Sequence, residues 1–160
     1  MVGEKTIAMQ LQKLGLKFRF IGRSEVHRLS SVLHDQEEIQ HCIYGYCNDS
    51  GVLLVATDQR LILVDNRFLF VHQRTINYDE ITHSSVSSGM LAVTLQLHVQ
   101  SKSVNFKTYA DARLKKLQEY IVEVQDAFEN RNILSYAEAD IQDWALPFGV
   151  PANVDPNPSL

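Results

Sequence analysis

Hydrophobic and polar positions follow helical spacing at the start of the chain. Apolar residues recur at intervals of four and three up to Leu14, which predicts a short amphipathic helix over residues 4–14. Apolar positions share one face again from residue 25 to about residue 33, and Ser24 is placed to cap that second helix. The pattern therefore predicts two short helices before the first strand.

From Ile39 the pattern changes to short runs of β-forming residues, which are separated by polar turn residues. The run over residues 91–99 alternates apolar and polar side chains, so one face of this strand is expected to be solvated and the other buried. The predicted strands cover residues 39–47, 52–56, 61–64, 73–78, 81–88, 91–99 and 103–107. Consecutive short strands joined by tight turns predict an antiparallel sheet that curls into a barrel or sandwich.

A long amphipathic helix follows the strands. From Ala110 to Phe128 apolar residues recur at intervals of four and three, which makes one apolar stripe. Thr108, with Asp111 three residues on, is predicted to cap this helix of about 20 residues. A further short helix is predicted around residues 136–145. Because a single apolar stripe needs a surface to cover, the long helix is expected to close one open end of the curled sheet.

The segment LLVATDQRLILV, residues 53–64, resembles a hairpin that is typical of bacterial pleckstrin-homology-like (PH-like) domains. Residues 76–81, the alternating hairpin and the closing helix are similarly placed, so the resemblance covers roughly residues 35–130. It implies a mainly β fold with α-helices: a PH-like barrel of about seven antiparallel strands, closed by a C-terminal amphipathic helix and preceded by short N-terminal helices. Such domains bind phospholipids, peptides or other proteins, so the resemblance implies a binding module rather than an enzyme.

The polar residues inside this segment, Thr57 to Arg60, are interpreted as the turn of a β-hairpin. Asp58 is expected to bond to its own backbone, and Arg60 is expected to pair its guanidinium with a nearby carboxylate. A phosphate-binding loop would need glycines followed by a helix N-terminus, and this segment has neither.

The chain is expected to divide into three parts: an N-terminal helical extension over residues 1–34, a PH-like domain over residues 35–131, and a C-terminal tail over residues 132–160 that is Pro-rich at its end. Charge is distributed unevenly. Residues 1–28 carry six Lys/Arg and two acidic residues, a net charge of +4, whereas the remainder carries nine basic and seventeen acidic residues, a net charge of −8. This asymmetry indicates either an interaction arm or a segment that packs on the acidic remainder.

The overall charge of −4 argues against a nucleic-acid partner, which would require a basic face. The sequence shows no secretory signal and no apolar run of membrane-spanning length, so a cytoplasmic location is expected.

Histidines and cysteines do not form a recognisable metal site. His27, His34 and His41 recur at seven-residue spacing, which would align them on one unbroken helix, but the predicted helix ends near His34. Cys42 and Cys47 lie five residues apart, which on a strand sends them to opposite faces, so two free thiols are expected.

Neighbouring carboxylates occur at Glu37/Glu38 and Asp79/Glu80, at predicted strand boundaries, and are interpreted as solvated turn charges. A general acid or base needs an enclosed site that shifts its pKa, and no Gly-x-Ser-x-Gly nucleophile turn is present. The sequence therefore predicts no catalytic residue, no metal ligand and no cofactor.

These observations favour a non-catalytic binding or assembly module that acts through protein–protein contact or self-association. The candidate interface combines apolar and basic residues of the N-terminal arm with two aromatic residues of the tail. Its residues are Lys13, Lys17, Phe18, Arg19, Phe20, Arg23, Trp144 and Phe148.

The alternative is a peripheral membrane adaptor that binds anionic phospholipid through the basic N-terminal arm. Lipid-binding PH domains hold phosphoinositide headgroups with a basic cluster on their first strands, whereas residues 39–59 contain no Lys or Arg. Specific phosphoinositide recognition is therefore not favoured. The sequence leaves open whether the arm packs on its own domain, on another subunit or on a membrane.

Overall fold

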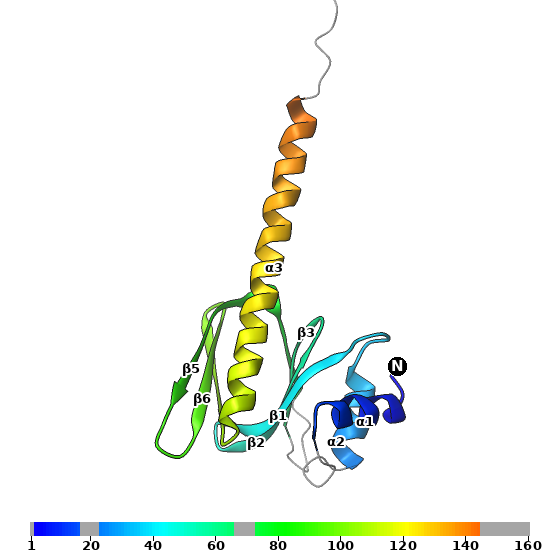
Figure 1. The fold of residues 1–160 in the computed structure, drawn as a ribbon, viewed down its shortest axis with the longest axis vertical. Coiled ribbons are helices and arrows are strands. Elements are labelled where there is room, and N and C mark those ends of the chain that lie inside the picture. The colour runs from blue at the N-terminus through cyan, green and yellow to red at the C-terminus, as the bar shows by residue number, and fades with distance from the viewer. Residues whose placement is uncertain (1, 17–22, 66–72, 145–160) are drawn as a thin grey trace, which may run out of the picture. The chain divides into compact units, whose positions relative to one another are not determined.

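The computed structural model describes residues 2–16, 23–65 and 73–144 of the 160-residue chain. Two compact units divide the chain, Met1–Ala127 and Phe128–Leu160, and the boundary falls within the last helix. In chain order the described elements, labelled in part in Figure 1, are α1 (Glu4–Lys13), α2 (Arg23–Val32), β1 (Ile39–Cys47), β2 (Ser50–Thr57), β3 (Arg60–Asp65), β4 (Gln73–Asn77), the 3₁₀ turn η1 (Tyr78–Glu80), β5 (Ile81–Ser88), β6 (Val93–Val99), β7 (Lys102–Thr108) and α3 (Asp111–Trp144).

The seven strands form one antiparallel sheet in the order β4-β3-β2-β1-β7-β6-β5. β1 joins the two halves of this sheet, since it pairs with β2 along its length and with β7 at Tyr46 and Lys107. β4 and β5 lie at the two edges, so the curled sheet is not closed by hydrogen bonds. The predicted fold class, with seven antiparallel strands, short helices before them and an amphipathic helix after them, is confirmed.

The strand predicted over residues 91–99 is β6, but it begins at Val93. Leu91 lies in the β5–β6 turn, where Gly89 N donates to Ala92 O, and its side chain is 84% exposed. The expectation that Leu91 faces the core is therefore wrong, because the turn extends as far as Ala92 and β6 begins only at Val93. The other apolar positions of β6 alternate with polar ones and are buried, as the pattern predicts.

The two N-terminal helices share a hydrophobic core with β1, β2 and β3. Ile7 and Leu11 of α1 and Leu29 of α2 are at most 2% exposed, and they belong to the same buried cluster as Val55 and Ile62 of the sheet. Burial of apolar side chains is the main favourable term in folding. The described part of the N-terminal extension is thus part of the core of the first unit.

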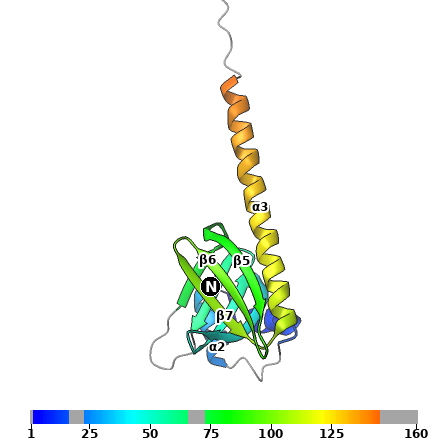
Figure 2. The same cartoon turned by 90° about the vertical axis from the view of Figure 1, so that its left-hand side faces the viewer.

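The apolar stripe predicted for the long helix is confirmed. Leu114, Leu117 and Ile121 of α3 are fully buried. Figures 1 and 2 both show the first half of α3 beside β5. Gln125 Nε2 donates to Ile81 O, the first residue of that strand, which holds the helix against the start of β5.

The predicted starts of two helices are wrong. α2 begins at Arg23, so Ser24 lies inside the helix; Ser is tolerated in a first turn, and its cap preference does not fix a boundary. α3 begins at Asp111. Thr108 Oγ1 accepts a hydrogen bond from Ala110 N at 3.3 Å in a local turn before the helix, instead of forming the predicted capping box.

The end of α3 also differs from the prediction. The helix continues to Trp144, so the separate short helix predicted around residues 136–145 belongs to α3. No Gly or Pro interrupts residues 112–144, and the next proline is Pro147. Without a helix breaker, the loss of an obvious apolar stripe after Phe128 does not end the helix.

Candidate functional site

The β2–β3 turn is organised by the hydroxyl of Thr57. Thr57 Oγ1 accepts hydrogen bonds from Gln59 N at 3.2 Å and Arg60 N at 3.0 Å. Asp58 instead bonds to the segment before β1: its Oδ1 accepts from Glu38 N at 2.9 Å, and its own N donates to Glu38 O at 3.0 Å. The hairpin turn is confirmed, but the local role predicted for Asp58 belongs to Thr57.

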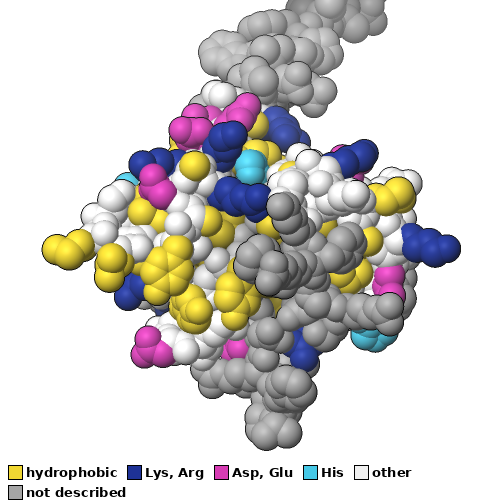
Figure 3. All heavy atoms as spheres, turned by 60° about the horizontal axis from the view of Figure 1, so that its bottom comes forward, with side chains coloured by type: hydrophobic (Ala, Val, Ile, Leu, Met, Phe, Trp, Pro, Cys, Tyr) yellow, Lys and Arg dark blue, Asp and Glu magenta, His cyan; other side chains and the backbone are white. Residues whose placement is uncertain are grey.

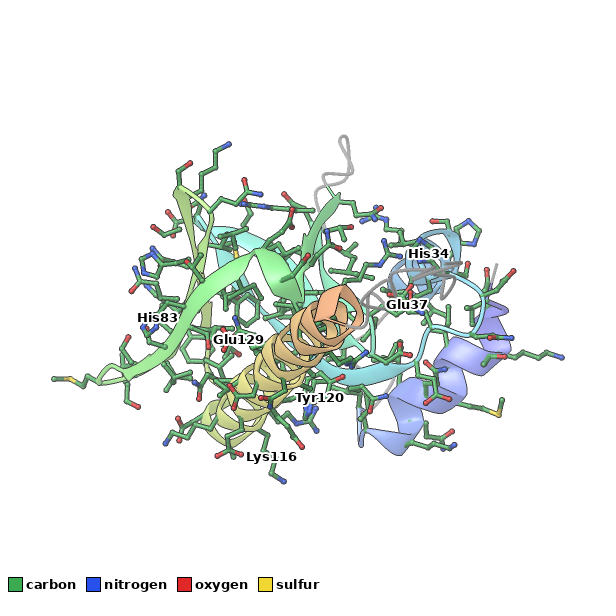
Figure 4. The ribbon with its side chains drawn as sticks, turned by 90° about the horizontal axis from the view of Figure 1, so that it is seen from above. His34, Glu37, His83, Lys116, Tyr120 and Glu129 are labelled. Carbon is green, nitrogen blue, oxygen red and sulfur yellow. The ribbon has the colours of Figure 1, made fainter. Side chains whose placement is uncertain are left out.

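A buried ion pair lies beneath this turn. The Glu37 side chain is 0% exposed. Its Oε1 accepts from Thr57 Oγ1 at 2.8 Å and from Arg60 Nε at 2.9 Å, and its Oε2 accepts from Arg60 Nη2 at 2.9 Å and His34 N at 2.7 Å. Arg60 also donates to Val32 O at the end of α2, and Figure 4 shows Glu37 beside His34. The carboxylate partner predicted for Arg60 is thus Glu37, and the expectation that Glu37 is solvated is wrong.

These contacts set the protonation of Glu37. Burial by itself raises the pKa of this carboxyl, but hydrogen bonds from Arg60, the His34 amide and Thr57, together with the charge of Arg60, outweigh burial and hold the pKa below its ordinary value. Four donors occupy the two oxygens, so Glu37 has a structural role.

This lowered pKa predicts a dependence of stability on pH. A carboxyl whose folded pKa is depressed stabilises the fold above its unfolded pKa, about 4.3 for Glu, and that contribution is lost as pH falls through the folded pKa. We expect the free energy of unfolding of the wild type to fall more steeply below about pH 5 than that of Glu37→Gln. Urea unfolding at several pH values measures both slopes, and parallel slopes would contradict the assignment.

Two tyrosines extend the network to η1 and α3. The hydroxyls of Tyr78 and Tyr120 donate to the carbonyl oxygen of Thr57, at 2.6 Å and 3.2 Å. Burial raises the pKa of both phenols, so they remain protonated donors at neutral pH. The network therefore ties α2, the β2–β3 turn and α3 together.

The chain leaves β7 at Thr108 and enters α3 close to β1. Thr108 Oγ1 donates to Tyr44 O at 2.9 Å, and Arg113 Nη2 donates to Gly15 O, just after α1, at 3.1 Å. Between these elements lies a groove of about 550 Å³, here called the tyrosine groove. It is lined by Gly15, Leu16, Ile43, Tyr44, Tyr46, Thr108, Tyr109, Ala110 and Arg113.

Three tyrosine side chains give the groove an amphipathic surface. Tyr44 and Tyr46 project from one side of β1, are 42% and 40% exposed, and meet edge to face with ring centroids 5.9 Å apart. Tyr109 is 73% exposed. On the face drawn in Figure 3, hydrophobic side chains gather beside Lys and Arg side chains and a histidine. Large exposed aromatic side chains grouped around a hollow are typical of a binding site.

The tyrosine groove shares Ile43 and Arg113 with a second hollow of about 390 Å³, here called the basic hollow. Its other lining residues are Leu14, His41, Cys42 and Lys116. Within the described ranges, neither Arg113 nor Lys116 has a carboxylate partner. Figure 4 shows Lys116 on α3. The basic hollow thus offers two uncompensated cations beside an apolar groove.

Burial lowers the pKa of His41, and the neighbouring Lys116 lowers it further, so the imidazole is mainly neutral near pH 7. Burial raises the pKa of Cys42 to about 12, so this thiol is protonated and unreactive. Cys42 and Cys47 are both free, which confirms the prediction for the cysteines.

No metal site is found among the residues that the structure describes: no three His, Cys, Asp or Glu side chains converge there. The three histidines at seven-residue spacing have separate partners. His27 Nδ1 lies 2.7 Å from Glu4 Oε1, His34 approaches the Glu37 carboxylate, and the His41 ring packs against Tyr120.

Comparison with known proteins assigns the fold to a family. The family model described as "Bacterial PH domain" matches residues 33–123, which is more than half of the chain. The chain belongs to the bacterial PH domain family. The PH domain framework therefore covers the segment before β1, all seven strands and the first part of α3.

Two solved bacterial structures resemble this PH domain. A PH-domain-containing protein from Exiguobacterium sibiricum 255-15 is 14% identical, with a TM-score of 0.59, over 84% of this chain and 78% of that one. A DUF1696 family protein with a pleckstrin-homology domain from Shewanella loihica PV-4 is 19% identical, with a TM-score of 0.46, over 66% of this chain and 98% of that one. No curated protein matches the chain.

In this PH domain the first two strands carry no basic cluster. β1, the turn after it and β2 contain no Lys or Arg, and Arg60 at the start of β3 is occupied by Glu37. Among the described residues, no helix is long and apolar enough to cross a bilayer.

The interface residues predicted from the sequence lie mostly outside the described part of the chain. Lys13 is exposed on α1. Arg23 and Trp144 stand at the first position of α2 and the last of α3. Lys17, Phe18, Arg19, Phe20 and Phe148 are outside the described residues. Their role in binding stays a prediction.

The tyrosine groove was not predicted. The alternation of β1 places Tyr44 and Tyr46 on one face, and that was the available signal. Tyr109 and Arg113 line the same groove because the β7–α3 junction packs against β1. That packing includes the hydrogen bond from Thr108 to Tyr44 O, which joins residues more than 60 positions apart.

Proposed function

We propose that this bacterial PH domain is a non-catalytic binding module that takes a segment of a partner protein in the tyrosine groove. The observation that carries the proposal is the grouping of three exposed tyrosines around a hollow of about 550 Å³. Tyrosine is enriched at protein interfaces because its ring supplies apolar area while its hydroxyl stays hydrogen-bonded. PH domain membership suggests a binding or adaptor module and supports this proposal.

Charge defines the chemistry of the partner segment. Arg113 lies at the junction of the tyrosine groove and the basic hollow, and Lys116 lies one turn further along α3. A carboxylate that reached these cations would gain charge-assisted hydrogen bonds. The proposed ligand is therefore a peptide segment with aromatic or aliphatic side chains for the groove and a neighbouring Asp or Glu for the basic hollow.

Other features support binding over catalysis. PH domains are generally non-catalytic. The buried carboxylate of Glu37 is fully hydrogen-bonded, and the Cys42 thiol is protonated.

We place the module in the cytoplasm, as expected from the sequence.

Selection from a random peptide display library on the full chain tests the proposal. The expected sequences combine apolar residues with at least one Asp or Glu. Tyr109→Ser and Arg113→Glu should each weaken a selected peptide at least about tenfold, since hot-spot residues at interfaces contribute about 2 kcal/mol or more. Lys102→Glu, at the exposed start of β7, makes the same charge change away from the groove and should leave affinity unchanged.

Anionic vesicles provide the contrasting arm of the same experiment. The membrane alternative predicts salt-sensitive vesicle binding that Lys13→Glu weakens and Arg113→Glu does not. That result, combined with a failure to select groove-dependent peptides, would replace the proposed function by the membrane adaptor.

A further inference from the structure

A β-bulge at the start of β5 aligns two histidines across β5 and β6. The register shifts by one residue there, so that His83 rather than Thr82 stands directly opposite His98. Without the extra residue, His83 would stand opposite Leu97 and point toward the core, because a shift of one residue moves a side chain to the other face of a sheet. Thr82 Oγ1 donates to His98 O at 3.2 Å across the bulge. The bulge therefore brings both imidazoles to the polar face of the sheet.

The two imidazole rings lie close enough to share one metal ion. Their centroids are 5.9 Å apart, and the ring planes are inclined at 42°. A bond from zinc to an imidazole nitrogen is about 2.0 Å long, and the ring centroid lies roughly 1 Å beyond that nitrogen, so two imidazoles on one tetrahedral ion have centroids about 5 Å apart. His83 is exposed and His98 is half-buried, so a small rotation of the exposed His83 side chain closes the difference.

The surroundings of the pair leave both rings accessible to a cation. Among the residues that the structure describes, neither ring has a hydrogen bond or ion pair to another group. The neighbours on the same face are Ser85 on β5, Gln96 on β6 and, opposite His98, Ser103 on β7. None of these three carries a charge that would repel a metal ion. Figure 4 shows His83 on the side of β5 away from α3.

We propose that His83 and His98 bind a divalent transition-metal ion. Neutral imidazole is the commonest metal ligand in proteins, and it suits Cu²⁺, Ni²⁺ and Zn²⁺, whereas Mg²⁺ and Ca²⁺ prefer oxygen ligands. The pair supplies two protein ligands, fewer than the three or four of a resident metal centre, so water completes the coordination and the ion exchanges with the solution. Neither histidine lines the tyrosine groove or the basic hollow. The metal site is therefore separate from the proposed peptide site.

Isothermal titration calorimetry of the untagged full chain with Cu²⁺, Ni²⁺ and Zn²⁺ tests the proposal. The wild type is expected to bind one ion per chain, with Cu²⁺ bound more tightly than Ni²⁺ or Zn²⁺. His83→Asn and His98→Asn should each weaken binding at least about tenfold, since even the outer-shell partners of metal ligands contribute about 10–100-fold to affinity. His27→Asn removes an exposed histidine of α2 and should leave binding unchanged.

Thermal melts provide a second measurement on the same variants. A ligand that binds the folded state alone raises the melting temperature. Zn²⁺ should therefore raise the melting temperature of the wild type and of His27→Asn, but not that of His98→Asn. Melts without metal check that each variant is folded.

Three outcomes would overturn the proposal. They are a wild type that binds none of the three ions, an affinity that is unchanged in His83→Asn and His98→Asn, and binding that is lost in His27→Asn instead. The last result would place the ion at His27 and Glu4, whose side chains also lie within contact distance. Neither His83→Asn nor His98→Asn is expected to change peptide affinity, and Tyr109→Ser is expected to leave metal binding unchanged. The failure of one proposal is therefore distinguishable from the failure of the other.

Discussion

Replacing Arg60 by Met should lower the free energy of unfolding by about 3–5 kcal/mol, because it leaves a fully buried carboxylate without its cation. Arg60 supplies two of the four hydrogen bonds to Glu37 and a further one to Val32 O. Removing it therefore costs the desolvation of Glu37 as well as the lost contacts. Urea unfolding followed by circular dichroism measures the loss.

A double variant separates this cause from a general packing defect. Glu37→Leu combined with Arg60→Met replaces the pair by apolar side chains, and such replacements are often close to neutral. We expect the double variant to be more stable than Arg60→Met alone. A double variant that is no more stable than Arg60→Met alone would contradict a role for the uncompensated charge of Glu37. Lys102→Met, at an exposed position, is the control for removing a basic residue.

Gly45→Ala should be the second most damaging change. A Cβ at Gly45 would lie 2.4 Å from Lys107 O and 2.4 Å from Phe106 Cζ, so β1 passes too close to β7 for any side chain. Relieving the clash must separate strands that contribute to the core. We expect a loss of about 1–3 kcal/mol in unfolding free energy, and a loss of peptide binding because Tyr44 and Tyr46 flank the displaced residue.

Gly51→Ala is the matched control for this prediction. A Cβ there would meet the Tyr44 hydroxyl at 2.2 Å, and that hydroxyl is the far end of a side chain that is able to rotate. The expected loss of stability is smaller than for Gly45→Ala, although Tyr44 must move. Thermal melts of both variants compare the two costs. Equal losses would show that the close approach of β1 to β7 is not what requires glycine.

Periodicity was sufficient to predict most of the fold. The alternation in β6 and the stripe of Leu114, Leu117 and Ile121 are local signals, because they depend on neighbouring residues that share one face. The resemblance in residues 53–64 then gave the correct family. Element boundaries were less well predicted, since α3 passes through a region without a clear stripe and ends only at Trp144.

What the sequence did not predict depends on contacts between distant positions. Glu37 looked solvated beside Glu38, but it is buried because Arg60, 23 residues later, folds over it. The tyrosine groove combines the segment just after α1, the middle of β1 and the junction of β7 with α3. No local pattern reports such an arrangement, because each tyrosine taken alone is an ordinary exposed aromatic residue.

Titration of the isotopically labelled full chain with a display-selected peptide, followed by backbone-amide NMR, tests the central claim most directly. The account predicts shift changes that centre on Tyr44, Tyr46, Tyr109 and Arg113, and that disappear in Arg113→Glu. Shift changes that centre on α1 around Lys13, or on β5, with the groove unaffected, would contradict the claim that this PH domain binds a protein segment in the tyrosine groove.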